Sequence, residues 1–74
     1  MTPEKELEIL NEAIDLIKHL QELFVKSGEC TEGRVGATHA FNAYVMLQGA
    51  KAYLHKQRLV LQDVILRQRL ATNA

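Results

Sequence analysis

Two long stretches of the chain carry apolar residues at helical spacing, and a glycine-rich segment separates them. In the first, about residues 3–26, apolar side chains recur every three or four positions, which is typical of an amphipathic α-helix. The second, about residues 37–71, has no proline and predicts one continuous helix of roughly 50 Å at 1.5 Å per residue. Three glycines between residues 27 and 36 predict the turn that joins them.

The first helix has a clear start and two apolar rows. Thr2 is a good N-cap, and Pro3 suits the first helical position, where its missing N–H costs nothing. The first row is Leu7, Leu10, Ile14, Ile17 and Phe24, broken by Gln21, and the second is Ile9, Ala13, Leu16, Leu20 and Leu23. Together the rows cover roughly 200° of the circumference, about twice the arc that one partner helix needs. The pattern therefore predicts two neighbours for this helix.

The second helix is apolar almost all the way round at its start, which is typical of a buried helix. Two columns repeat every seven residues: Ala40, Leu47, Leu54 and Leu61, and then Val45, Ala52, Leu59 and Leu66. Such columns favour coiled-coil-like antiparallel packing. We expect the helix to begin between residues 32 and 39, capped by Thr31 or Thr38, and to continue through the polar segment His55–Arg58.

The two helices differ in length, and this difference predicts self-association. Folded back antiparallel, a first helix of 24 residues reaches only to about residue 61 of the second, which leaves the apolar residues of the segment 64–70 without cover. Soluble monomers avoid contiguous apolar patches of this kind. We therefore predict an all-α antiparallel two-helix hairpin, one domain over residues 1–74, that assembles into an oligomeric bundle such as a four-helix bundle. The predicted oligomer interface is Leu47, Leu54, Leu61, Val64, Ile65, Tyr53 and Met46.

Charge indicates how the two halves of the chain pack, and cysteine content indicates the compartment in which the protein works. The net charge is zero, but the chain up to Glu32 has three basic and eight acidic residues, net −5, and the remainder has six and one, net +5. Opposite charges on the two halves favour packing them side by side. Cys30 is the only cysteine, so no disulfide forms within the chain, and this usage indicates a reducing, intracellular setting. With no signal-peptide pattern and no run long enough to span a membrane, we expect a cytoplasmic protein.

Catalytic and metal-binding patterns are weak. Cys30 and His39 lack a third residue that would orient them, so they do not form a convincing nucleophilic site. His19 does not complete the Glu-x-x-His step of bundle metal sites, because Leu16 stands three positions before it. We therefore expect no enzyme activity, no metal and no cofactor.

The function predicted from these patterns is non-enzymatic. We expect a homo-oligomer that binds another macromolecule, most naturally a protein, as an adaptor, inhibitor or regulator. One alternative is a small-anion or nucleotide binder at the start of the second helix, with an anion site formed by Arg34, Gly33, Gly36 and Thr38. The other alternative is a nucleic-acid binder with a basic stripe formed by Lys51, Lys56, Arg58, Arg67 and Arg69.

Overall fold

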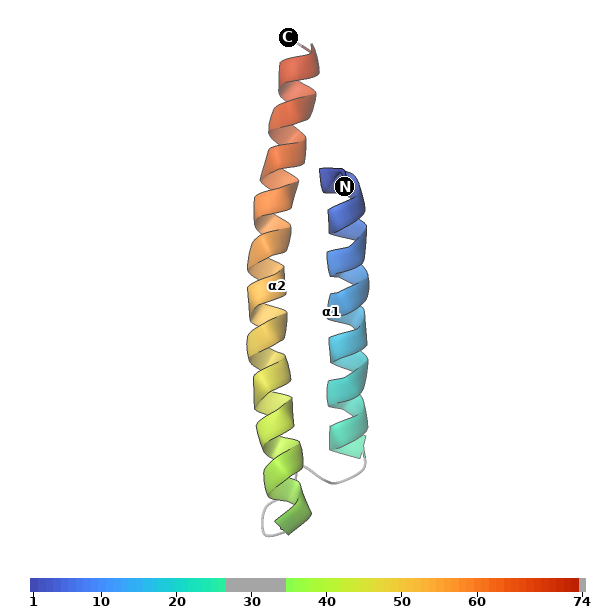
Figure 1. Ribbon diagram of the computed structural model, residues 1–74, viewed down its shortest axis with the longest axis vertical. Helices are drawn as coiled ribbons and strands as arrows, with labels where there is room; N and C mark the ends of the chain where they lie inside the picture. The colour runs from blue at the N-terminus through green and yellow to red at the C-terminus, as the bar shows by residue number, and fades with distance from the viewer. Residues whose placement is uncertain (27–34, 74) are drawn as a thin grey trace.

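Two antiparallel helices lie side by side along their lengths (Figure 1). The computed structural model describes residues 1–26 and 35–73; helix α1 spans Pro3–Lys26 and helix α2 spans Val35–Asn73. The predicted all-α hairpin is confirmed. The two predicted N-caps of α2 lie outside what the structure describes: Thr31 is not among the described residues, and the side chain of Thr38 is not described.

The first turn of α1 is closed by Thr2. The backbone N–H of Lys5 donates to the Thr2 hydroxyl at 3.2 Å, and the N–H of Glu6 donates to the Thr2 carbonyl at 3.0 Å. These bonds satisfy amides that have no partner inside the helix. Glu4 and Glu6 place negative charge beside the positive end of the helix dipole, and Lys26 lies in the last turn, where positive charge is favourable. Local sequence therefore accounts for both ends of α1.

Helix α2 runs without interruption for 39 residues, including the polar segment His55–Arg58. Local contacts support its C-terminal half. Arg67 Nε lies 2.9 Å from Asp63 Oδ2, the favourable i, i+4 arrangement. Near the end of the helix, the Thr72 hydroxyl donates to the Gln68 carbonyl at 2.8 Å. The absence of glycine or proline in this half leaves no physical cause for a kink.

The register of the hairpin is set by side chains that meet across it. Gln21 bonds to Gln48, and Asn11 bonds to Arg58, so the residue numbers of each facing pair add up to 69. The last residue of α1 thus lies opposite residue 43 of α2, and the first lies opposite residue 66. Helix α2 therefore extends past α1 at both ends (Figure 1).

This register corrects the expectation that the segment 64–70 lacks cover within the chain. Ile65 is buried, with 7% of its surface exposed, and it lines a groove with Glu4 and Leu7 of α1. The expectation was wrong for this residue because it assumed that pairing starts at the first residue of the second helix. The segment 35–42 instead extends beyond the end of α1. The part of α2 that packs on α1 therefore lies further towards the C-terminus than expected. Leu66 and Leu70 remain exposed.

The hairpin is slender and encloses little. It measures 60 × 16 × 14 Å and has a radius of gyration of 17.1 Å, whereas a compact chain of this length has about 11 Å. Ile14 is the one large side chain that is fully enclosed within the described residues, at 1% exposure; Ala40 and Ile65 are the other buried apolar residues. Two helices alone cannot surround a core.

Candidate interaction surface

Near the turn end of α1, the contact between the helices contains a buried polar residue. The side chain of Gln21 is 4% exposed and makes three hydrogen bonds to α2. Its amide N–H group donates to Gln48 Oε1 at 2.9 Å and to the Tyr44 carbonyl at 3.3 Å, and its carbonyl oxygen accepts from Lys51 Nζ at 2.9 Å. A buried amide needs such partners, since an unpaired one costs about 1–3 kcal/mol. The cluster therefore fixes the register of the two helices.

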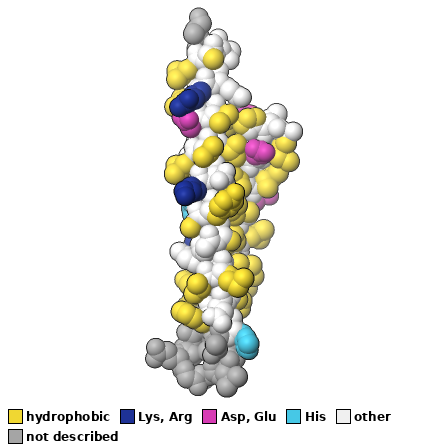
Figure 2. Space-filling model, turned by 60° about the vertical axis from the view of Figure 1, so that its left-hand side comes forward, with side chains coloured by type: hydrophobic (Ala, Val, Ile, Leu, Met, Phe, Trp, Pro, Cys, Tyr) yellow, Lys and Arg dark blue, Asp and Glu magenta, His cyan; other side chains and the backbone are white. Residues whose placement is uncertain are grey.

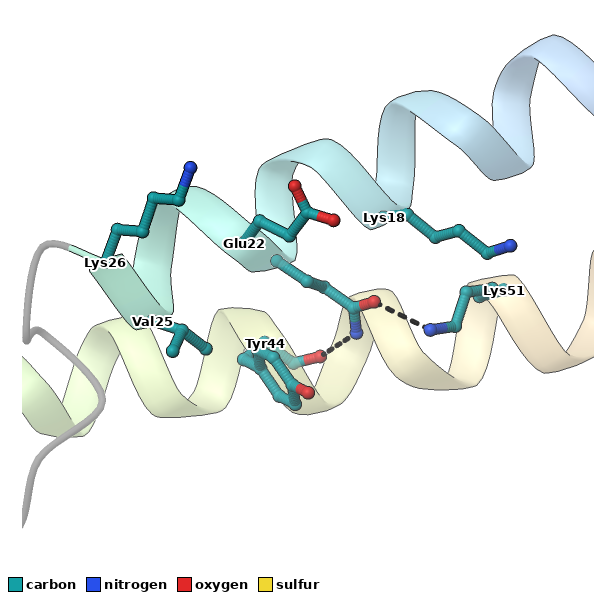
Figure 3. A pocket seen from close by; sticks show the side chains of 7 residues that line it. Lys18, Glu22, Val25, Lys26, Tyr44 and Lys51 are labelled. Atoms are coloured by element: carbon teal, nitrogen blue, oxygen red, sulfur yellow. Dashed lines mark hydrogen bonds between the residues drawn. The ribbon is translucent and has the colours of Figure 1, made fainter.

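This cluster lies at the bottom of an open groove of about 420 Å³ between the helices (Figure 3). Lys51 reaches across from α2 to Gln21, and Lys18 extends from α1 along the same groove. Glu22 and Lys26 line its rim and point away from α2. The groove is a polar side of the hairpin, and its central amide already has its hydrogen-bond partners.

A second polar contact lies two turns further along α2. Arg58 Nη2 lies 2.9 Å from His55 Nδ1, and Arg58 Nη1 donates to Asn11 Oδ1 at 3.4 Å; the Nε atom of Arg58 is buried and has no hydrogen-bond partner. Desolvation lowers the pKa of His55 below its ordinary value of 6.5, and the positive charges of Arg58, Lys18 and Lys51 lower it further. The unprotonated Nδ1 of a neutral imidazole accepts a hydrogen bond from the Arg58 guanidinium, so the arrangement favours uncharged His55.

The opposite side of the hairpin is apolar. Ile9 and Val60 line one open groove of about 340 Å³ between the helices. Seven-residue spacing continues this side along both helices, and the residues involved are all exposed. We call it the composite face; it consists of Ile9, Leu16, Leu20 and Leu23 of α1 and Met46, Gly49, Tyr53 and Val60 of α2. Leu16 is 65% exposed, Tyr53 62% and Met46 76%, so these side chains have little cover within the chain.

A second apolar row, distinct from the composite face, follows α2 at helical spacing, and its member Leu66 lines a groove with Glu4 and Leu7 of α1. We call it the outer row; it consists of Phe41, Val45, Ala52, Leu59, Leu66 and Leu70, all exposed. Figure 2 shows hydrophobic side chains along much of α2 and over the neighbouring α1, with Lys and Arg side chains at only a few points between them. Apolar surface on this scale is characteristic of interaction sites.

The structure divides the predicted interface residues into two groups. Met46 and Tyr53 are exposed and belong to the composite face. The others are half-buried or buried in the hairpin: Leu47, Leu54, Leu61, Val64 and Ile65. The predicted interface left out the second apolar row of α1, from Ile9 to Leu23. The spacing of this row had already indicated that α1 needs a second neighbour.

The predicted basic residues do not share one side of the molecule. Lys51 and Arg58 are half-buried and bond to polar side chains of α1, and Arg69 lines a groove with Glu4. Lys56 and Arg67 are exposed, and Arg67 pairs with Asp63. Helical spacing places these last two on the far side of α2 from the first three.

The predicted anion site lies largely beyond the structural description. Gly33 and Arg34 fall outside the described residues, as does Cys30. Gly36 and Thr38 lie in the first two turns of α2, and the side chain of Thr38 is not described. His39 is exposed near the start of the same helix.

The described part of the chain offers neither a metal site nor a membrane span. Residues 1–26 and 35–73 contain no group of three or more His, Cys, Asp or Glu side chains that would hold a metal ion. Neither described helix has a stretch apolar enough to cross a membrane. Comparisons of the chain with protein-family models, curated proteins and solved structures found no match.

Proposed function

We propose that this protein is a non-enzymatic homo-oligomer whose assembled form binds a macromolecular partner as an adaptor, inhibitor or regulator. The observation that carries the proposal is the presence of two separate apolar surfaces, the composite face and the outer row of α2. One surface serves self-assembly, and the second remains available to another protein. The cytoplasm suits this role, since the chain relies on no intrachain disulfide.

The total surface of the chain supports self-assembly. A compact monomer of 8.4 kDa exposes about 4,600 Å², whereas this chain exposes 5732 Å². The surplus is about 1,100 Å², and the exposed side chains include large apolar ones such as Leu16, Met46 and Tyr53. Burying apolar surface contributes roughly 25 cal/mol per Å², so association of copies is the most direct way to stabilise the fold.

The outer row supports a macromolecular partner. It extends from Phe41 to Leu70, a length of about 44 Å along the helix. An apolar stripe of this length and spacing suits an amphipathic helix or another extended apolar surface of a protein. No comparable feature favours nucleic acid, because the basic side chains are divided between two sides of α2.

The first test is the mass in solution, measured by light scattering after size exclusion at several concentrations. We expect a dimer or a larger species that dissociates on dilution. A chain that stays monomeric at the highest concentration contradicts the proposal, since both apolar surfaces would then be stable in water.

The second test asks whether the assembled form keeps an accessible apolar surface. We expect the dye 1-anilinonaphthalene-8-sulfonate to bind the oligomer, and the double variant Leu59→Lys/Leu66→Lys to lose binding without a change of mass. Loss of assembly in this variant would instead place the outer row inside the oligomer, and it would remove the support for a separate partner.

A further inference from the structure

The composite face consists of residue pairs, one from each helix, that lie at the same height along the hairpin; we call each pair a rung. Ile9 lies at the height of Val60, Leu16 at the height of Tyr53, and Leu23 at the height of Met46, because each pair of numbers adds up to 69, as in the inner contacts. Two such faces are therefore complementary when one copy is turned by 180° about an axis parallel to the helices. Helix α1 of each copy then packs on α2 of the other, and the apolar rungs stay level.

The fourth rung contains an unexplained glycine. Gly49 lies at the height of Leu20, in the interior of α2, where glycine weakens a helix relative to alanine. A Cβ atom at this position would meet nothing within 4 Å, so the hairpin itself gives no reason for glycine. A second copy gives one, because Leu20 of the partner would enter the space above Gly49. Small residues opposite large ones let helices approach closely.

We propose that this chain forms a two-fold dimer through its composite face, with the symmetry axis parallel to the helices and α1 of each copy packed on α2 of the other. The inference rests on the self-association proposed above and specifies its surface and geometry. It leaves the outer row outside the dimer. The resulting four-helix bundle has antiparallel neighbours throughout, which is the favourable arrangement for such bundles.

The available area fits this dimer. A standard interface covers about 800 Å² on each partner. The surplus surface of the chain, about 1,100 Å² over that of a compact monomer, is sufficient for one interface of this size.

Charges at the edges of the composite face decide between the two possible two-fold axes. With the axis parallel to the helices, Glu12 lies at the height of the partner's Lys56. Lys5 lies at the height of the partner's Asp63, and these two also form ion pairs within the chain, with Glu8 and Arg67. Neither Glu12 nor Lys56 has an ion-pair partner among the described residues. An axis perpendicular to the helices would stack α1 on α1 and α2 on α2, which separates both pairs. Complementary charge therefore favours the parallel axis.

The first experiment exchanges the large and small residues of the fourth rung. Gly49→Leu should raise the dimer dissociation constant by about tenfold or more, because the added side chain overfills the contact with Leu20. The double variant Leu20→Ala/Gly49→Leu should recover much of the affinity. The matched control is Ala52→Leu, which adds a leucine to the outer row and should leave the dimer unchanged. Sedimentation equilibrium measures all four proteins.

The second experiment reverses the edge charges. Glu12→Lys and Lys56→Glu should each weaken the dimer about threefold at low salt, because each change disrupts one exposed pair on both sides of the axis. The double variant Glu12→Lys/Lys56→Glu should restore wild-type affinity. Failure of this rescue, with Gly49→Leu still weakening the dimer, overturns the parallel axis.

The outcomes separate this inference from the function on which it rests. A monomeric wild-type chain would refute self-association itself. An oligomer of unchanged affinity in Gly49→Leu would overturn the composite face as the interface, while self-association would stand. In that case the glycine substitution should instead raise the melting temperature, because leucine is the better helix former.

Discussion

The inner contact of the hairpin places polar side chains among buried apolar ones such as Ile14, whereas the composite face leaves apolar side chains exposed. The inner contact contains Gln21, Lys51, His55 and Arg58, held by hydrogen bonds across and along the helices. The composite face, by contrast, is predominantly apolar and exposed. Polar groups inside a helix pair specify register at a cost in stability. The polar side chains of the inner contact are suited to fix how the helices align, and in the proposed dimer the composite face would supply further apolar burial.

The largest effect should come from the one large side chain that the inner contact fully encloses. Ile14→Ala should lower the free energy of unfolding by about 3 kcal/mol, since it removes buried methylene groups and leaves a cavity. The shift of the urea midpoint measures this loss. The neighbouring change Asp15→Ala, at an exposed position, should stay within about 0.5 kcal/mol of the wild type. Equal losses in both variants would mean that Ile14 does not hold the helices together.

The composite face gives the next largest expected effect. In the proposed dimer the exposed Leu16 becomes buried between copies, so Leu16→Lys should lower the free energy of unfolding of that dimer by about 1–3 kcal/mol. The loss should be greatest at high protein concentration, where the wild type is assembled. Thermal unfolding at several concentrations measures it, with Asp15→Lys as the control on the polar side. Leu16→Lys unfolding like the wild type at every concentration would indicate that this face stays in water.

The polar cluster should contribute less to stability and more to alignment. Gln21→Ala should cost about 1–2 kcal/mol, because Lys51 Nζ and Gln48 Oε1 lose their buried partner. A double-mutant cycle with Gln48→Ala should show a coupling of about 0.5–1 kcal/mol between the two amides. Additive losses in the cycle would mean that the two side chains act independently and do not define the register.

The pH dependence should be the smallest of these effects. The pKa of His55 is lower in the folded chain than its ordinary value of 6.5, so the unfolded chain binds more protons as the pH falls through this region. The stability that His55 contributes is therefore complete above about pH 6.5 and is lost as the pH falls through its folded pKa. NMR titration of the His55 ring measures the lowered pKa directly. His55→Gln should flatten the dependence of stability on pH between about 7.5 and 5.

Much of the fold follows from local patterns in the sequence. Apolar spacing, the Thr2 cap and the glycines of the turn suffice to predict two helices and an antiparallel pair, because each signal depends on neighbouring residues. The register does not follow in the same way. It depends on Gln21 meeting Gln48, and the break that Gln21 makes in an apolar row reveals a special position without revealing its partner.

The candidate interaction surface was only partly predictable for the same reason. The leucines of the main heptad column of α2 are half-buried in the hairpin, so part of each side chain already packs within the chain. Ile65 was misassigned because counting residues from the turn cannot locate where pairing begins. The second row of α1 was visible in the sequence. Its pairing with Met46, Tyr53 and Val60 can be recognised only once the register of the two helices is known.

Among the large side chains of residues 1–26 and 39–72, Ile14 alone is fully enclosed, which has a consequence for how this protein tolerates change over evolution. In most domains, substitutions accumulate on the surface and are rejected in the interior. Here the interior is nearly absent, so selection has few enclosed positions on which to act. If the chain functions as an assembly, a complete substitution scan should find that the exposed residues Leu16 and Tyr53 tolerate as few substitutions as the enclosed Ile14. Conventional reasoning from solvent exposure would classify those two positions as free to vary.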